Sequence, residues 1–265
     1  MSTRLRPAAV AGMFYPDSAH RLSREAGAML AGVAGAPAER PKALIVPHAG
    51  YVYSGPVAAS AFALLVNWKD TIRRVLLLGP THRVAVRGLA LPDCDAFATP
   101  LGSVPIDQEA AAAIRDLPQI VVSDPAHRLE HSLEVEIPFL QVVLDEFSLL
   151  PLAVGEASPD AVAEALDRLW GGPETLIVVS SDLSHYLPYE DARQIDAETA
   201  RQIGNLDPII NHYQACGATP VNGLLLAARK RGLQARQLDL RNSGDTAGDR
   251  RQVVGYGAFA FFEAF

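Results

Sequence analysis

Three short apolar segments of the sequence are each followed, within a few residues, by side chains that can bind metals or transfer protons. The segments are residues 43–46, 74–79 and 176–181, and the side chains that follow them are His48, His82, Asp182 and His185. Imidazoles and carboxylates are common ligands of iron, copper and zinc, and they are also the usual general acids and bases. The sequence has no HExxH motif and no paired CxxC motif, so spacing alone does not identify a metal site.

The recurrence of this pattern is more informative than any one residue in it. A single histidine is more often a structural residue than a ligand, and that alternative applies to each of these histidines. Residues 43–46 and 74–79 are separated by a helical segment, which predicts a βαβ unit with parallel strands. Ligands bind beyond the carboxyl ends of such strands. His48 and His82 are therefore expected to meet if their two strands are near neighbours.

Two further candidates lie later in the chain. His131 lies near the start of residues 127–144, a segment whose apolar residues recur at helical spacing. Cys216 precedes a helix predicted at 219–231, and the dipole of that helix is expected to favour the thiolate. Taken alone, Cys216 is better explained as a small buried apolar residue, and the same explanation applies to Cys94.

The remaining pattern predicts one α/β domain, residues 1–265, built on a mixed and largely parallel sheet with helices on both faces. Further strands are expected at residues 148–154, 234–240 and 253–262. Helices are expected at residues 18–30, 57–67, 107–117, 158–170, 190–203 and 207–214. Pro56 is expected at the first position of its helix, where its missing N–H is not needed.

Composition restricts the classes of function. The chain has 265 residues, of which 49% are hydrophobic, and its net charge is −7, so a nucleic-acid partner is not expected. Its two cysteines do not make a disulfide framework, which favours a reducing, cytoplasmic location. The N-terminal residues lack the apolar region of a signal peptide, and no apolar run is long enough for a membrane span.

The order of the motifs is more specific than any one of them. The motifs HAGYVYSG, GPTHR, EHSLEVEIPFL, SSDLSHY and CGATPVNG occur in this order over nearly the whole chain. They resemble the Memo family, whose bacterial and archaeal members are called AmmeMemoRadiSam system protein B. The opening RPAAVAGMFYP and the closing VVGYGAFAF also resemble that family. The resemblance implies a fold similar to that of the LigB-type, class III extradiol dioxygenases, which use non-haem iron.

The resemblance also implies a set of site residues. The metal ligands that it implies are His48, His82 and Cys216. It places Asp182 close to the metal, and His131 and His185 in the same cleft as acid–base or catalytic groups. Tyr51 and Tyr53, which belong to HAGYVYSG, are expected to line the substrate pocket.

This sequence departs from the dioxygenase pattern in one ligand. Extradiol dioxygenases use two histidines and a glutamate, whereas a cysteine takes the third place here, which puts ring cleavage in doubt. Three functions remain open: a redox metalloprotein with iron first and copper second, a hydrolase with zinc, and a non-catalytic module that binds a peptide or a partner protein. The expected substrate is an unknown small molecule or peptide. The family name implies a functional link to radical-SAM and Ammecr-type proteins.

Overall fold

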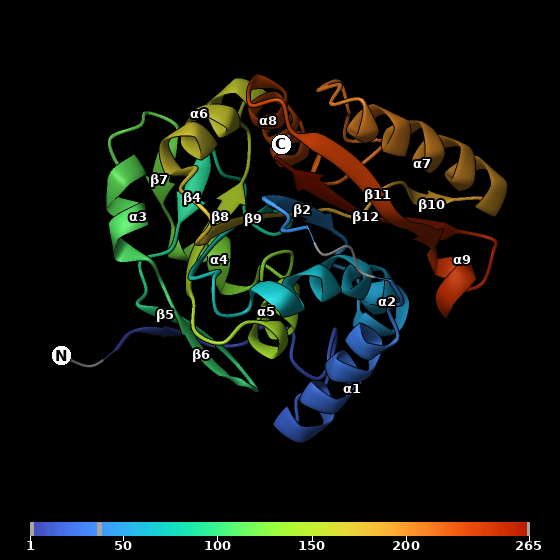
Figure 1. Cartoon of the computed structure of the whole chain (residues 1–265), viewed down its shortest axis with the longest axis horizontal. Coiled ribbons are helices and arrows are strands. Elements are labelled where there is room, and N and C mark those ends of the chain that lie inside the picture. The colour runs from blue at the N-terminus through green and yellow to red at the C-terminus, as the bar shows by residue number, and fades with distance from the viewer. Residues whose placement is uncertain (1–2, 36–38, 264–265) are drawn as a thin grey trace.

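A nine-stranded sheet crosses the middle of the computed structural model, which describes residues 3–35 and 39–263 (Figure 1). The termini of the expected domain, residues 1–2 and 264–265, lie outside the described residues. The strand order is β10-β12-β2-β9-β3-β8-β4-β7, and β11 also pairs with β12. The strands are β2 (Ala43–Val46), β3 (Arg74–Pro80), β4 (Leu89–Leu91), β7 (Ile120–Val122), β8 (Ser148–Val154), β9 (Thr175–Ser180), β10 (His185–Leu187), β11 (Gln234–Asn242) and β12 (Val253–Phe262).

The centre of the sheet is parallel, as the apolar segments predict. β9 lies between β2 and β3 and runs parallel to both, and β8 runs parallel to β3 on its other side. All four strands consist mainly of buried apolar residues, which is typical of a sheet that is covered on both faces. The antiparallel pairs lie outside this centre, where β12 borders β2 and β4 borders β8. The carboxyl ends of β2, β9 and β3 therefore meet at one edge.

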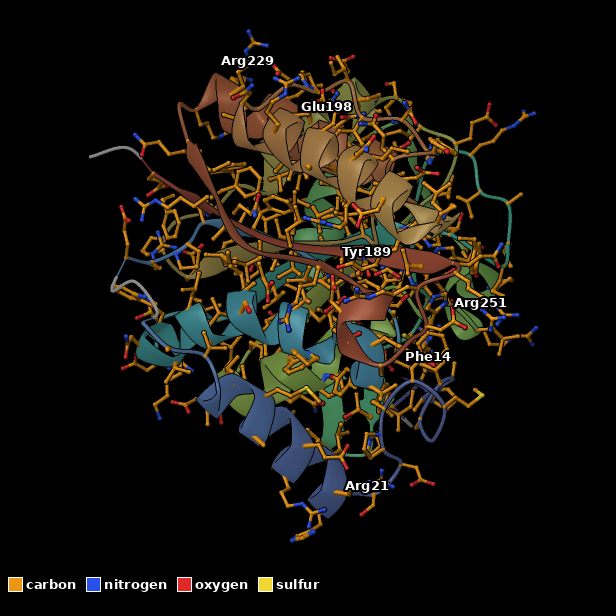
Figure 2. All side chains as sticks on the ribbon, turned by 90° about the vertical axis from the view of Figure 1, so that its right-hand side faces the viewer. Phe14, Arg21, Tyr189, Glu198, Arg229 and Arg251 are labelled. Carbon is orange, nitrogen blue, oxygen red and sulfur yellow. The ribbon has the colours of Figure 1, made fainter. Side chains whose placement is uncertain are left out.

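Helices cover both faces because successive strand residues point to opposite sides. Leu44 and Val46 pack into one apolar core, whereas Ala43 and Ile45 pack into another. The first core contains residues of α1 (Ala19–Ala31), α2 (Tyr51–Phe62) and α5 (Ile137–Val143). The second contains residues of α3 (Gln108–Ile114), α6 (Pro159–Leu169), α7 (Tyr189–Gly204) and α8 (Ala218–Lys230). Arg21 on α1 and Arg229 on α8 accordingly lie at opposite edges of the molecule in Figure 2.

A small second sheet and several short helices complete the described structure. β1 (Leu5–Arg6) pairs with β5 (Ala96–Thr99), which forms a hairpin with β6 (Gly102–Pro105). The short helices are η1 (Ala63–Trp68), α4 (Asp124–Arg128), η2 (Glu134–Glu136) and α9 (Ser243–Thr246). No helix within residues 3–35 and 39–263 has the length and apolar character that crossing a membrane requires.

The helix that follows β2 starts earlier than predicted. α2 begins at Tyr51, and its first turn is closed by backbone hydrogen bonds from Tyr53 and Ser54 to the carbonyl of Gly50 at 2.8 and 3.1 Å. Pro56 therefore lies inside the helix rather than at its first position. A proline there leaves the carbonyl of Val52 without its helical donor. Val52 is 64% exposed, so water can take that place.

Two other segments differ in outcome: the helix predicted at residues 207–214 was wrong, whereas the helical run expected within residues 127–144 is present as η2 and α5. A polar turn separates α4 from η2 and α5 there. The carboxylate of Glu130 accepts backbone hydrogen bonds inside that turn. Residues 207–214 form no helix. Pro208 follows Asp207 there, and a residue before proline is disfavoured in the helical region.

Candidate metal centre

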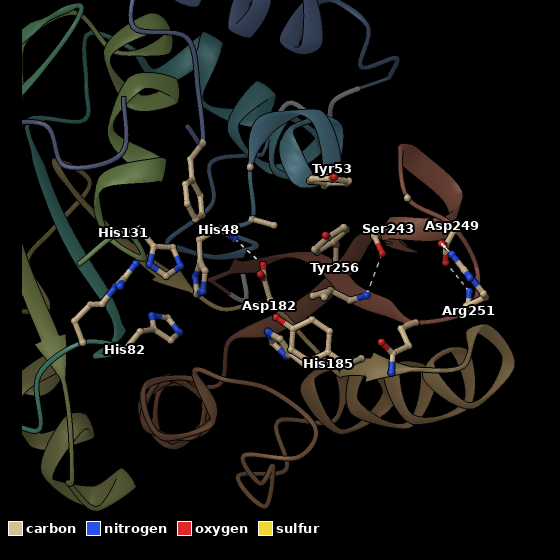
Figure 3. A pocket seen from close by; sticks show the side chains of 18 residues that line it. His48, Tyr53, His82, His131, Asp182, His185, Ser243, Asp249, Arg251 and Tyr256 are labelled. Atoms are coloured by element: carbon tan, nitrogen blue, oxygen red, sulfur yellow. Dashed lines mark hydrogen bonds and ion pairs between the residues drawn. The ribbon is translucent and has the colours of Figure 1, made fainter. Parts of the chain in front are cut away.

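Three imidazoles converge at the carboxyl edge of the parallel strands (Figure 3). His48 follows β2, His82 follows β3, and His131 lies in the turn between α4 and η2. One ring nitrogen from each lies within 4.8 Å of the others. The ring centroids are 5.3 Å apart for His48 and His82, and 4.6 Å apart for His82 and His131. The meeting of His48 and His82 that parallel strands predict is thus confirmed, although β9 lies between their strands.

His48 is almost completely buried and neutral. Only 2% of the residue is exposed, and burial holds its pKa well below the usual range. Its Nδ1 lies 2.7 Å from Oγ of Ser180, the last residue of β9. A neutral imidazole that uses one nitrogen for a hydrogen bond keeps the other for a metal ion.

Glu130 holds His82 and His131 in place. Its carboxylate accepts hydrogen bonds from the backbone N–H of His82 at 2.5 Å and from Nδ1 of His82 at 2.8 Å. It also accepts from the backbone N–H groups of His131 and Ser132, each at 2.9 Å. Burial alone would raise the pKa of Glu130, but the hydrogen bonds and the charge of His82 lower it to about 2. A carboxylate on one ring nitrogen of His82 leaves Nε2 available as a ligand.

His131 is neutral and incompletely hydrogen-bonded. Burial lowers its pKa to about 4, and Phe14 packs against its ring at 4.8 Å between centroids. Its Nδ1 has no hydrogen-bond partner within the described part of the chain, although Oε1 of Glu130 lies 3.4 Å away. His131 was predicted as an acid–base residue. Its position in the cluster would also allow it to be a metal ligand.

Cys216 lies beside His48, and a glycine allows this approach. Its Sγ is 3.4 Å from Nε2 of His48. A Cβ added to Gly217 would lie only 2.7 Å from Cβ of Ser181, so the small residue lets this segment pass close to the end of β9. The expected helix effect on the thiol is wrong for the metal-free protein, because burial raises the pKa of Cys216 to about 12. The thiol is therefore protonated at neutral pH until something displaces its proton.

Asp182 lies next to the cluster and also stabilises the turn after β2. Its Oδ1 accepts a hydrogen bond from the backbone N–H of His48 at 2.8 Å. Burial raises the pKa of this carboxyl to about 7, against the hydrogen bonds from the backbone of His48 and Ala49. Asp182 is not one of the three residues whose ligand atoms converge within 4.8 Å. It is placed to exchange a proton near neutral pH.

The cluster opens into a cleft of about 1080 Å³. The cleft extends from the three histidines past Asp182 to the loop that carries Asp249 and Arg251 (Figure 3). Tyr53 lines it, as predicted, together with Phe14, Tyr186 and Tyr256. Tyr51 does not: it is 3% exposed, and its hydroxyl donates to the carbonyl of Val135 at 3.0 Å. On a helix, side chains two positions apart point in different directions, so only one of this tyrosine pair faces the cleft.

His185 lines the same cleft in a defined tautomer. Its Nδ1 lies 2.8 Å from the backbone carbonyl of Leu183, which can only accept a hydrogen bond, so Nδ1 carries the proton. Burial lowers the pKa of His185, which keeps the ring neutral. Its Nε2 is thus a free base, which fits the predicted acid–base role.

A second cavity, of about 660 Å³, reaches the site from another side. His82 and Cys216 are among its lining residues, and His82 lines the cleft as well. Its outer wall includes Val86 and Gly155, where a Cβ on the glycine would lie 2.1 Å from the carbonyl oxygen of Val86. The two backbones are therefore in direct contact at this wall.

The sequence comparisons identify the family of this chain. The Memo-like protein family matches residues 6–260. The chain belongs to this family. A MEMO1 family protein of Aquifex aeolicus is 36% identical, covering 96% of this chain and 97% of its own length. A MEMO1 family protein of Aeropyrum pernix is 35% identical, covering 96% of this chain and 99% of its own.

One solved structure shares the fold at low sequence identity. It is the uncharacterized protein JW3007 from Escherichia coli K12, with a TM-score of 0.52 and 12% identity over 82% of this chain and 99% of that one. At this identity the likeness concerns the fold alone. The Memo-like chain thus has the mixed α/β architecture that its motifs imply, and it shares this fold with the protein from Escherichia coli.

The donor groups of this Memo-like site fit a first-row transition metal. The imidazoles of His48, His82 and His131 converge at the edge of the sheet, and the thiol of Cys216 lies beside His48 but is not one of the three residues whose ligand atoms converge within 4.8 Å. A nitrogen ligand and a sulfur ligand at normal bond lengths and a tetrahedral angle lie roughly 3.6 Å apart. The 3.4 Å between Nε2 of His48 and Sγ of Cys216 is close to that value. The residues present therefore fit a metal ion without a change of fold.

Three residues that shape the Memo-like site were not predicted from the sequence. They are Glu130, Glu136 and Ser180, and each is at most 1% exposed. Two of them are glutamates in the motif EHSLEVEIPFL, where acidic residues alternate with apolar ones. Glutamates are almost never fully buried unless they are paired, so such a motif could have signalled polar partners inside the core.

Proposed function

We propose that this protein is a metalloprotein that holds one divalent first-row transition metal, iron before copper or zinc, between His48, His82 and Cys216. The observation that carries the proposal is the convergence of His48 and His82, with the thiol of Cys216 beside His48. The cysteine is chosen as third ligand on the family resemblance and on its 3.4 Å distance from Nε2 of His48. His131 is the geometric alternative, because its ring nitrogen lies within the same cluster.

The residues around the metal ligands divide the remaining tasks. Glu130 orients His82 through the hydrogen bond to Nδ1 and supplies a compensating negative charge. His185 presents an unprotonated Nε2 to the cleft, and Asp182 has a pKa of about 7, so both can accept a proton from a substrate. Phe14 and Tyr53 supply apolar walls. A bound divalent ion supplies Lewis acidity or electron transfer at this position.

The proposal covers substrate and partners in general terms only. A cleft of about 1080 Å³ has room for a small molecule or for the side chain of a peptide. A functional link to radical-SAM and Ammecr-type proteins rests on the family resemblance alone.

Metal titration of the reduced protein tests the ligand set. The wild type is expected to bind one ion, and His48→Ala and His82→Ala to lose at least about 100-fold in affinity, since even residues that only support a ligand contribute 10–100-fold. Cys216→Ser should bind more weakly and should lose any thiolate-to-copper absorption. His131→Ala should retain a stoichiometry of one. Loss of metal in His131→Ala with retention in Cys216→Ser would replace the cysteine by His131.

The matched control is His127→Gln. His127 is a buried histidine outside the cluster, and its Nε2 lies 2.8 Å from the carbonyl of Ala90. This variant should bind metal as the wild type does. Equal affinity in all variants would refute the metal site and leave a binding module as the better function. Elemental analysis of anaerobically purified protein separates the chemistries, because iron or copper supports redox work and zinc supports hydrolysis.

A further inference from the structure

A buried carboxyl group lies behind His48 with no cation beside it. Glu136 and Ser180 are both 0% exposed, and Oε1 of Glu136 is 2.9 Å from Oγ of Ser180. Oε2 of Glu136 has no hydrogen-bond partner among the described residues. Burial raises the pKa of Glu136 well above its usual range, and only the hydrogen bond with Ser180 opposes this. An ionised carboxylate here would be a buried charge without compensation.

The hydroxyl of Ser180 has three polar neighbours and only one proton to donate. Its Oγ lies 2.6 Å from the backbone carbonyl of Ser132, 2.7 Å from Nδ1 of His48 and 2.9 Å from Oε1 of Glu136. The carbonyl can only accept, so the proton of Ser180 points to it. The other two neighbours must then donate to the lone pairs of Oγ. That requires an N–H at Nδ1 of His48 and an O–H on Glu136.

Other proton assignments leave a repulsive contact. If Glu136 were ionised and took the proton of Ser180, the lone pairs of Ser180 Oγ and the Ser132 carbonyl would face each other at 2.6 Å. If Ser180 donated to Nδ1 of His48, the carbonyl of Ser132 would be left without a donor, and so would an ionised Glu136. An unsatisfied buried polar group is strongly unfavourable. Only the neutral acid with the Nδ1–H tautomer satisfies all three contacts.

We propose that Glu136 is held as a neutral carboxylic acid and acts, with Ser180, as a positioning residue that fixes His48 in the tautomer with a free Nε2. That nitrogen is the one beside Cys216. The link to metal binding rests on the proposed function, whereas the protonation of Glu136 and the tautomer of His48 are properties of the metal-free protein. Neither side chain touches a substrate or the reacting atoms.

Infrared spectroscopy of the metal-free protein at about pH 7.5 tests the protonation of Glu136. The difference spectrum between wild type and Glu136→Gln should contain the C=O band of a protonated carboxyl group, present in the wild type and absent in the variant. The difference isolates this group from Asp182, whose pKa is about 7. A band of an ionised carboxylate in its place would overturn the proposal.

Nitrogen-15 NMR of the metal-free protein tests the tautomer. His48 should carry its proton on Nδ1 in the wild type and in Glu136→Gln, whose amide N–H can donate in place of the O–H. Glu136→Met should remove one hydrogen-bond partner of the Ser180 hydroxyl, so that part of His48 adopts the Nε2–H tautomer. Ser180→Ala should increase the population of this tautomer further. Thr199→Ala, which removes another fully buried hydroxyl, should leave the tautomer unchanged. A wild-type tautomer in both Glu136→Met and Ser180→Ala would overturn the positioning role.

Metal affinity then connects the two proposals. Ser180→Ala should weaken binding about 10–100-fold, the usual effect of removing a partner of a ligating histidine. Glu136→Gln should bind as the wild type does. Wild-type affinity in Ser180→Ala would overturn the link between the tautomer and the metal. If the wild type binds no metal but the spectra are as expected, the proposed function fails and the hydrogen-bond chain stands.

Discussion

Lys42 and His48 flank the two ends of the same short strand, β2, and both are almost completely buried. Lys42 is surrounded by acceptors: its Nζ contacts the carbonyls of Trp170, Gly172 and Thr175 at 2.6, 3.0 and 3.0 Å. His48 instead shares its end of the strand with two other imidazoles and a cleft. Every N–H of the Lys42 ammonium has a carbonyl acceptor. The imidazole of His48 has one nitrogen, Nε2, whose lone pair is available.

The two ends also differ in charge. Burial lowers the pKa of Lys42 to about 8, so its ammonium persists at neutral pH within its ring of carbonyls. Burial holds the pKa of His48 well below its usual range, so the imidazole is neutral. The carbonyls around Lys42 use its protons within the fold, whereas the convergent imidazoles that face a cavity are available for binding. Burial alone therefore does not distinguish a structural residue from a functional one; the unused hydrogen-bonding capacity does.

The largest expected effect is a loss of folding stability when Lys42, immediately before β2, is replaced. Lys42→Met leaves several buried carbonyls without a donor and should lower the free energy of unfolding by at least about 1–3 kcal/mol, the usual cost of one unsatisfied buried polar group. Denaturant unfolding measures this change. Metal stoichiometry should stay at the wild-type value, since the substitution lies at the opposite end of β2 from the histidines. Loss of metal binding in folded Lys42→Met would break the distinction between the two ends.

The next effect concerns the carboxylate behind His82. Glu130→Gln removes the negative charge and places an amide N–H against donors that now bond to the carboxylate. Metal affinity should fall about 10–100-fold, as for other partners of ligating histidines. Titration of the folded variant, compared with Glu164→Gln at an exposed position on α6, measures it. An unchanged affinity would mean that Glu130 only stabilises the turn.

The last expected effect is a pH dependence from Asp182. Its pKa is raised to about 7 in the folded protein, so the native state binds more protons than the unfolded state between about pH 4 and 7. The free energy of unfolding is therefore expected to fall as pH rises through this window and to level off above it. Each unit of pKa difference corresponds to about 1.4 kcal/mol, as an upper order of magnitude.

The variant Asp182→Asn isolates this contribution. Its side-chain oxygen can still accept from the backbone N–H of His48, but it does not titrate. The difference in unfolding free energy between wild type and variant, measured from pH 4 to about pH 8, should follow the predicted decline. A difference that does not change with pH would place the titration elsewhere, for example in Asp196, whose pKa burial raises to about 6.

The features that the sequence predicts well are those encoded in local pattern. The apolar runs that become β2, β3 and β9 are short, continuous and bounded by turn residues, so both their strand character and the residues at their ends follow from the chain itself. His48 and His82 meet because parallel strands share one carboxyl edge, which is a rule of topology. The family motifs add Cys216, which periodicity alone would leave as an apolar residue.

The features that it does not predict depend on distant partners. Glu130 becomes a buried carboxylate only because His82, 48 residues earlier, turns its ring and backbone toward it. Within residues 127–144 the helical run begins only after this turn, where the same carboxylate accepts from the backbone N–H groups of His131 and Ser132. The helix after Gly217 predicts a thiolate at Cys216, but desolvation outweighs that dipole. Burial is a tertiary property, so the directions of these pKa shifts cannot be predicted from local sequence.

The two cavities that meet at His82 affect how molecules can reach the site. A substrate or inhibitor that fills the cleft of Tyr53 and Tyr256 closes one entrance, while the cavity lined by Cys216 stays open on another side. The backbones of Val86 and Gly155 are in direct contact in the wall of this second cavity. His82 and Cys216 therefore border open space on that side even when a molecule fills the cleft. Filling of the cleft and exclusion of solvent from His82 are separate properties of this molecule.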